Sequence, residues 1–140
     1  MSTTDHITDF LNELVHWAAS QPEVKAVGLV GSYAREAASP ESDIDIIILA
    51  EDPGEFIKNT DWLKSFGLIK KLLVEDYGRV TSLRAWYENG REVEFGLTTP
   101  AWAGSPLEDG TERTIREGMQ VLFERELLLS PLLNKVQRGE

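Results

Sequence analysis

The sequence predicts an α/β (α+β) domain in which a mixed β-sheet of about five strands carries helices packed on one face. Segments with apolar residues at every third or fourth position alternate with short β-branched runs, so helices and strands are expected to follow one another along the chain. Asn89-Gly90, between two β-type runs, is a strong hairpin signal. A length of 140 residues suits one domain, so we expect residues 1–140 to form a single domain.

Turn-forming residues separate the expected elements. Pro22 and Gly67 end helices, and Asp76-Tyr77-Gly78 separates two strands. In chain order we expect a helix over residues 4–20, strands over 24–30 and 43–50 with a short helix at 34–38 between them, a helix over 56–66, strands over 68–75, 80–87 and 92–98, a helix over 111–126 and a last helix within 127–136.

Composition and charge exclude several classes of function. The 14 basic and 24 acidic residues give a formal charge of −10, which repels nucleic acid polymers. No cysteine is present, which removes disulfides, thiolate nucleophiles and cysteine-bound metals and suits a reducing cytosol. No apolar run reaches the length of a membrane span, and the polar, acidic start lacks the features of a signal peptide. We therefore expect a cytoplasmic protein without membrane contact.

The first chemically informative feature is the point where a strand meets a helix, at Gly31-Ser32. The backbone amides of a first helical turn have no partner within the helix, and together with the Ser32 hydroxyl they suit a phosphate group. Gly31 would allow a ligand to approach the backbone closely. The same pair is also common at an ordinary helix start, where it has only a structural role.

The second feature is a pair of acids on the following strand. Asp43 and Asp45 are two residues apart, so their side chains share one face of the strand, roughly 6.6 Å apart along it. Ile44, Ile46 and Ile48 take the opposite, buried face. Two carboxylates beside a phosphate site suit a hard divalent cation and a polyphosphate. Taken alone, the pair could equally be a solvated strand face.

Together these residues resemble a known signature. Gly31-Ser32, ten residues and then Asp43-x-Asp45 are similar to the motif of the polymerase-β-like nucleotidyltransferase superfamily. Residues 31–35 and 42–46 (Gly-Ser-Tyr-Ala-Arg and Ser-Asp-Ile-Asp-Ile) most resemble its small members, the minimal nucleotidyltransferases and the aminoglycoside or lincosamide nucleotidyltransferases. The resemblance implies a nucleotidyltransferase-type sheet.

The resemblance also implies a reaction. In such enzymes the Gly-Ser turn, here Gly31-Ser32, binds the β- and γ-phosphates of a nucleoside triphosphate such as ATP. The two acids, here Asp43 and Asp45, bind two Mg²⁺ ions. A nucleoside monophosphate passes to a hydroxyl and pyrophosphate is released. Arg35 is a candidate for steadying the phosphates, and its other reading is a surface ion pair with a nearby acid.

A third carboxylate is implied by the same resemblance, as a metal ligand that helps to deprotonate the acceptor. Residues 91–97 alternate, so that Glu92 and Glu94 face away from Val93 and Phe95. We expect Glu94, in the middle of the strand, to be this ligand, with Glu92 as the second choice. The family most often has Asp here, so Glu is a departure.

The acceptor is expected to be a small molecule or a protein. Only about 40 residues follow the Glu94 strand, which leaves little chain for an acceptor groove, so a homodimer or a protein partner could complete it. Trp86 and Trp102 are the candidates for acceptor or partner contact, although packing is the commoner use of Trp. An alternative is a catalytically silent nucleotide-binding or antitoxin-like module that acts through a protein partner.

Overall fold

The computed structural model describes residues 3–34, 42–104, 109–125 and 127–137. Arg35 therefore lies outside the described residues. The elements, in chain order, are α1 (Thr3–Ala19), β1 (Val24–Val30), α2 (Gly31–Ala34), β2 (Ile44–Ala50), α3 (Pro53–Lys58), the 3₁₀ helix η1 (Asp61–Phe66), β3 (Ile69–Asp76), β4 (Thr81–Tyr87), β5 (Glu92–Thr98), the 3₁₀ helix η2 (Pro100–Ala103), α4 (Asp109–Glu117), β6 (Met119–Glu124) and α5 (Ser130–Gln137).

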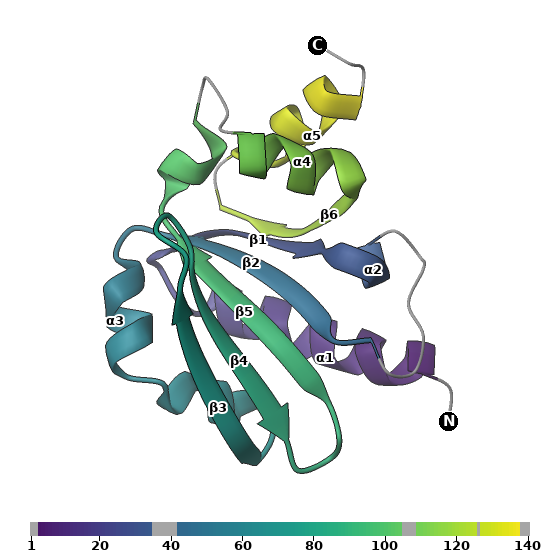
Figure 1. The fold of residues 1–140 in the computed structure, drawn as a ribbon, viewed down its shortest axis with the longest axis vertical. Helices are drawn as coiled ribbons and strands as arrows, with labels where there is room; N and C mark the ends of the chain where they lie inside the picture. Colours follow the sequence, from purple (N-terminus) through teal and green to yellow (C-terminus); the bar gives the residue numbers. More distant parts are fainter. Residues whose placement is uncertain (1–2, 35–41, 105–108, 126, 138–140) are drawn as a thin grey trace.

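A six-stranded mixed sheet forms the centre of the molecule, in the order β3-β4-β5-β2-β1-β6 (Figure 1). β2 and β5 run parallel, and the other neighbouring strands are antiparallel. The mixed α/β sheet predicted from the sequence is confirmed. The parallel pair matters most for function, because it places the middle of β5 directly beside the start of β2.

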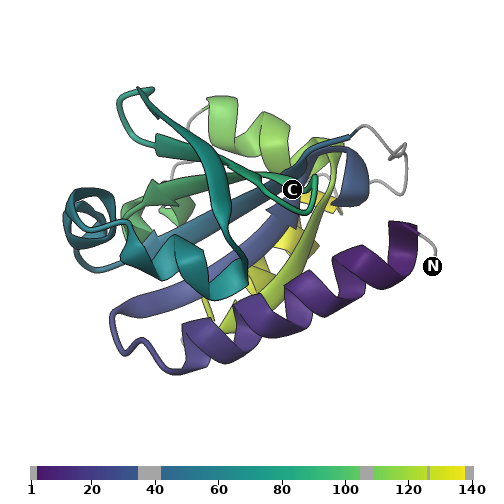
Figure 2. The ribbon, with the colours of Figure 1, turned by 90° about the horizontal axis from the view of Figure 1, so that it is seen from below.

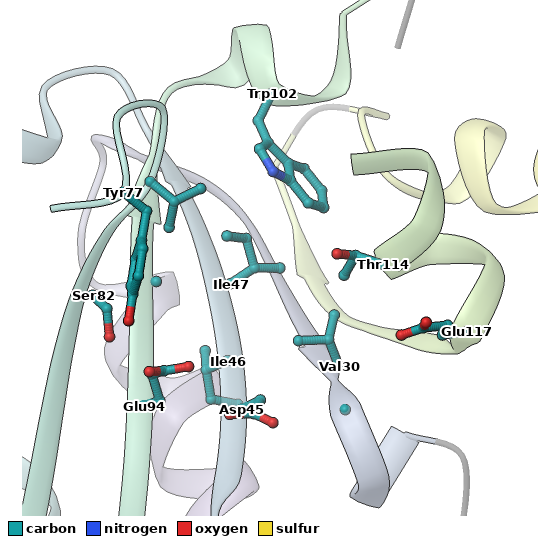
Figure 3. Close-up of a pocket in the computed structure, with 13 residues that line it drawn as sticks. Val30, Asp45, Ile46, Ile47, Tyr77, Ser82, Glu94, Trp102, Thr114 and Glu117 are labelled. Carbon is teal, nitrogen blue, oxygen red and sulfur yellow. The ribbon is translucent and has the colours of Figure 1, made fainter. Parts of the chain in front are cut away.

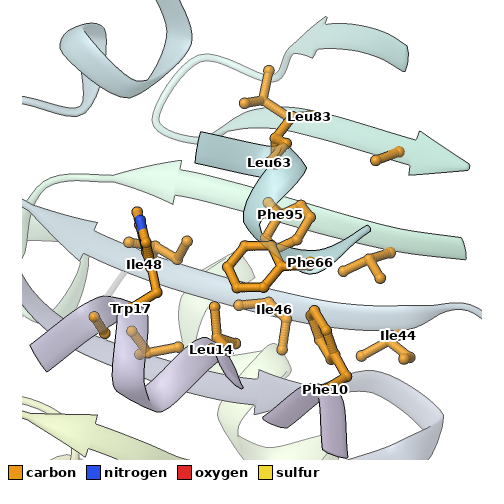
Figure 4. Close-up of a cluster of buried hydrophobic side chains, with 14 of the residues drawn as sticks. Phe10, Leu14, Trp17, Ile44, Ile46, Ile48, Leu63, Phe66, Leu83 and Phe95 are labelled. Atoms are coloured by element: carbon orange, nitrogen blue, oxygen red, sulfur yellow. The ribbon is translucent and has the colours of Figure 1, made fainter. Parts of the chain in front are cut away.

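One face of the sheet is covered by α1, α3 and η1, and this face holds the larger core. Ile44, Ile46 and Ile48 point into it from β2. The ring of Phe66 lies 5.5 Å from that of Phe10 and 5.8 Å from that of Phe95, which joins α1 and η1 to β5 (Figure 4). Because alternate residues of a strand face opposite sides of the sheet, the side chain of Asp45 lies on the face opposite this core.

Helices also lie on the other face, which corrects the expectation of a single helical layer. Ile47 and Leu49 pack there against Trp102, Ile115 and other residues of a second buried cluster. Figure 2 shows α1 along one side of the sheet and α4 on the side away from it. The second layer covers the β1–β2–β6 part of the sheet, and so it forms one wall beside the Asp45 face.

The sixth strand is the main departure from the predicted elements. The helix expected over residues 111–126 ends at Glu117, and Gly118 takes a φ of 140°, which favours glycine and breaks the helix. Met119–Glu124 then pairs antiparallel with β1. The spacing of Ile115, Met119 and Leu122 is typical of a helix. Residues 119–124 nevertheless form a strand, because as a strand they pair with the edge of β1 that β2 leaves free. None of the described helices is long and apolar enough to cross a membrane.

We expect Phe10→Ala to lower the free energy of unfolding by about 3–5 kcal/mol, because it empties a fully buried ring site between α1 and the sheet. Urea unfolding followed by circular dichroism measures this change. Leu68→Ala, at a side chain that is 75% exposed, is the matched control and should change stability by less than about 0.5 kcal/mol. A loss below 1 kcal/mol for Phe10→Ala would contradict the packing described.

Candidate active site

Acidic side chains from β2 and β5 meet on the face opposite the larger core. The parallel register places Asp45 beside Glu94, and the antiparallel register of β4 places Arg84 beside Glu94 on its other side. Asp43 lies just before β2 and reaches the same region. The structure therefore brings together the three carboxylates that the sequence singled out.

Arg84 lies at the centre of this acidic group. Its Nη2 is 2.9 Å from Glu94 Oε2 and donates a hydrogen bond to it, and it is 3.8 Å from Asp43 Oδ2. Its Nε is 3.7 Å from Glu92 Oε2. Burial lowers the pKa of Arg84, but the three carboxylates outweigh burial and raise that pKa above its ordinary value. The sequence alone places Arg84 on the strand expected over residues 80–87 but does not tell which face of that strand it occupies.

Asp45 is the carboxylate with the least compensation. Burial, followed by the negative charges of Asp43 and Glu94 and by a hydrogen bond with Asp43, raises the pKa of Asp45 to about 7, although Arg84 opposes the shift. For Asp45 to be mostly ionised at neutral pH, a further positive charge would have to lie beside it. The site is therefore short of cationic charge at Asp45.

Gly31 covers the Asp45 carboxylate from the end of β1. It has a φ of 74°, in the left-handed region, and a Cβ at this position would collide with Asp45 Oδ2. Glycine is thus required for two reasons: the backbone has a positive φ, and the Asp45 carboxylate occupies the space that a Cβ would take. Ser32 follows in the short helix α2, and of the two residues only Gly31 is among those that line the adjacent cavity.

A cavity of about 300 Å³ opens beside these residues. Figure 3 shows Asp45 and Glu94 together at one end and Trp102 towards the other, with Tyr77 and Ser82 along the wall. Ser82 is buried, and its Oγ has no hydrogen-bond partner among the described residues. Such an unsatisfied hydroxyl is a candidate for ligand contact.

The remaining candidates differ in their position relative to the cavity. Glu94 lines it, whereas Glu92, two residues earlier at the start of β5, is not among its lining residues; both carboxylates pair with Arg84. Trp102 lines it, whereas the Trp86 ring lies 5.0 Å from Lys71 Nζ. Sequence reasoning missed Ser82, Tyr77, Thr114 and Glu117 as cavity residues. The alternation of β4, which places Ser82 and Arg84 on one face, was the only available signal for any of them.

One observation argues against a divalent metal at these residues, and another argues for it. Among the described residues, no three carboxylate or histidine side chains are arranged to hold an ion, and Arg84 pairs with both Glu94 and Asp43. The donors are nevertheless all carboxylate oxygens, which hard cations prefer, and Asp45 lacks positive charge. The group fits a divalent cation in its chemistry, and holding one requires Arg84 to withdraw.

Comparison with known proteins gives consistent results. Residues 4–108 match the family model described as streptomycin adenylyltransferase. MJ0128 of Methanocaldococcus jannaschii, named as a candidate protein adenylyltransferase, is 35% identical over 77 residues, which are 55% of this chain and 66% of that protein. The chain thus spans just under two thirds of the length of this relative.

Two solved structures share the fold. An aminoglycoside 6-adenyltransferase from Bacillus subtilis aligns with a TM-score of 0.55 and 19% identity, over 67% of this chain and 35% of that chain. The Cid1 poly(U) polymerase aligns with a TM-score of 0.52 and 14% identity, over 82% of this chain and 34% of that chain. The chain spans about a third of each. At these identities the alignments show the common fold.

We expect Asp45→Asn to raise the melting temperature at pH 8 in the absence of divalent cations. A carboxyl group whose pKa is higher in the folded than in the unfolded state costs stability as the pH rises from about 4 to about 7. The gain from Asn should therefore be a few degrees at pH 8, on the order expected for about 1 kcal/mol, and should vanish towards pH 4.

Differential scanning fluorimetry from pH 4 to pH 8 measures this difference. Asp52→Asn, at an exposed carboxylate before α3, is the control and should show no gain that grows with pH. Equal melting temperatures for Asp45→Asn and the unaltered protein at every pH would contradict the crowding of negative charge at Asp45.

Proposed function

The chain belongs to the streptomycin adenylyltransferase family, and from this we propose that it transfers AMP from ATP to a hydroxyl group and releases pyrophosphate. One observation carries the proposal: Asp45 and Glu94, on parallel neighbouring strands, line one cavity directly beneath Gly31. This arrangement provides carboxylates for cations and a glycine turn for phosphates at the same point.

Asp43, Asp45 and Glu94 are the proposed ligands of two Mg²⁺ ions. Such ions stabilise the negative charge that develops on a phosphoryl group under attack and on its leaving group. The raised pKa of Asp45 supports this assignment, because it marks a place where added positive charge is favourable. Glu94, at the cavity and one strand away, is the proposed base that orients the acceptor hydroxyl and takes its proton.

Gly31 and Ser32 are the proposed contacts to the β- and γ-phosphates. Gly31 lines the cavity at the turn after β1, and Ser32, the next residue, adds a hydroxyl donor. Arg35 remains a proposed third contact. Arg84 now pairs with Glu94 and Asp43, and if these carboxylates held cations its guanidinium would be free to donate to a phosphate oxygen.

The acceptor is a small molecule or a protein side chain that carries a hydroxyl. The family description and the Bacillus enzyme favour an aminoglycoside-like molecule, whereas the name of MJ0128 favours a protein. The cavity end formed by Tyr77 and Trp102 is the proposed contact for this acceptor, with Ser82 as a hydrogen-bonding group.

A silent nucleotide-binding or antitoxin-like module is the second candidate function. The position of Arg84 favours this second function, because its guanidinium bridges Glu94 and Asp43, where the first function needs a metal cation. The two functions differ in whether the carboxylates are needed for a covalent product.

We expect incubation with labelled ATP and Mg²⁺ to give a labelled product with the protein itself, with streptomycin or with a protein in cell extract. Glu94→Gln should lower the rate by about 10²–10⁴-fold, because it removes the base, and Asp45→Asn should also abolish most transfer. Glu88→Gln, an exposed carboxylate beside the hairpin, is the control.

A product formed equally well by Glu94→Gln and Asp45→Asn would contradict the proposed site. If no acceptor class is labelled while Mg²⁺-dependent binding of ATP persists, the silent module is the better description.

We expect Arg84→Gln to lower the melting temperature in EDTA, because it leaves the carboxylates of Glu94 and Asp43 uncompensated. Mg²⁺ should then raise the melting temperature of the variant more than that of the unaltered protein, since the ion no longer competes with a guanidinium. Arg116→Gln, on the exposed side of α4, is the control. An equal response of Arg84→Gln and the unaltered protein to Mg²⁺ would show that Arg84 and the ion do not compete.

A further inference from the structure

β3 (Ile69–Asp76) is an edge strand. It pairs with β4 on one side, and among the described residues no strand pairs with its other side (Figure 1). The outward backbone N–H and C=O groups of such a strand can accept a further strand. β3 is eight residues long and therefore presents a substantial template.

Exposed apolar side chains gather at this edge. Leu68, Leu73, Val74 and Tyr77 are 75%, 41%, 50% and 63% exposed, and all four lie on β3 or directly beside it. Single exposed apolar residues are ordinary, but Leu73 on the cavity face and Val74 on the core face leave apolar surface exposed on both sides of this free strand.

The charges of β3 are divided along its length. Lys70 and Lys71 lie in its first half, and Glu75 and Asp76 in its second half. The strand is neutral, although the whole chain carries −10. A second strand of the same sequence, running antiparallel, would therefore place lysines opposite acids at both ends, without the repulsion that the net charge would otherwise produce.

We propose that two copies of this chain associate through β3, antiparallel, about a two-fold axis at Leu73. Lys71 of each copy then faces Glu75 of the other, and Leu73 meets its own equivalent. The sheets join into one continuous sheet of twice six strands.

The faces of β3 restrict the register. Lys71, Leu73 and Glu75 lie across from β4 residues of the cavity face, whereas Leu72 and Val74 lie across from residues of the core face. Residues directly opposite in an antiparallel pair point to the same face. From Lys71 onward, beyond the register shift between Ile69 and Lys71, only pairings that match odd with odd and even with even positions are therefore compatible with the rest of the sheet.

Among the central registers of this kind, only one matches the charges. An axis at Leu72 would set Lys71 against Leu73, and an axis at Val74 would set Leu73 against Glu75. The axis at Leu73 instead sets Lys71 against Glu75 and Leu72 against Val74. In this one register, oppositely charged side chains face each other and apolar side chains face each other.

The pairing has a consequence for the candidate active site, although it does not depend on catalysis. A two-fold axis through an antiparallel strand pair stands perpendicular to the sheet, so both cavities open on the same side.

The lysines of β3 also have a competing explanation, since edge strands commonly carry Lys to prevent association. Lys71 contacts the Trp86 ring within its own chain. A purely protective role predicts a monomer and gives no reason for the matching acids. The two explanations differ in the response to charge reversal.

The test is analytical ultracentrifugation of the full chain across low to high micromolar concentrations, because an interface of one strand is small and its dimer is expected to dissociate on dilution. Lys71→Glu and Glu75→Lys each place like charges opposite one another twice in the dimer, so each variant alone should be monomeric. An equimolar mixture of the two restores both pairs and should form a heterodimer. The doubly exchanged chain, Lys71→Glu with Glu75→Lys, should form a homodimer.

Lys64→Glu, on η1, is the control for the change in net charge and should leave the dimer intact. A monomer at every concentration would overturn the proposal, as would a dimer that survives both single reversals. If both reversals give monomers but their mixture does not associate, the proposed register is wrong. None of these outcomes bears on AMP transfer, which is measured separately.

Discussion

Electrostatic repulsion between carboxylates on two parallel strands is the constraint on which the rest of this structure depends. The pairing of β2 with β5 fixes Asp45 beside Glu94, and Asp43 adds a third negative charge. A fold keeps such a group only if positive charge compensates it. Arg84, on β4, supplies part of that positive charge. The raised pKa of Asp45 indicates that the negative charge is not fully compensated.

The surrounding fold serves this arrangement. The aromatic core packs beneath β2 and β5, which pair side by side and carry Asp45 and Glu94, and the second helical layer walls the cavity on the opposite face. Gly31 closes the space above Asp45 without a side chain. The Asp45 carboxylate therefore lies against the backbone where the Cβ of any other residue would be.

Much of this could be predicted from the sequence, because the signals were local. Strict alternation placed Asp43 with Asp45 and Glu94 opposite the core, and the five strands up to Thr98 follow the β-branched runs. Non-local choices could not be predicted. Residues 119–124 became a strand because β1 lacked a neighbour, and the position of Arg84 among the acids depends on the register of β4. For Ser82 the alternation of β4 predicts only a shared face with Arg84, and its burial without a partner among the described residues depends on the surrounding fold.

The central claim, that crowded negative charge at Asp45 requires a cation, is tested most directly by the pKa of that one side chain. Carbon-detected NMR of the Asp45 carboxyl group, followed through a pH titration without divalent ions, should give a pKa of about 7, and added Mg²⁺ with ATP should lower it. A pKa near the ordinary 3.8 without metal, or one that Mg²⁺ and ATP leave unchanged, would contradict the account.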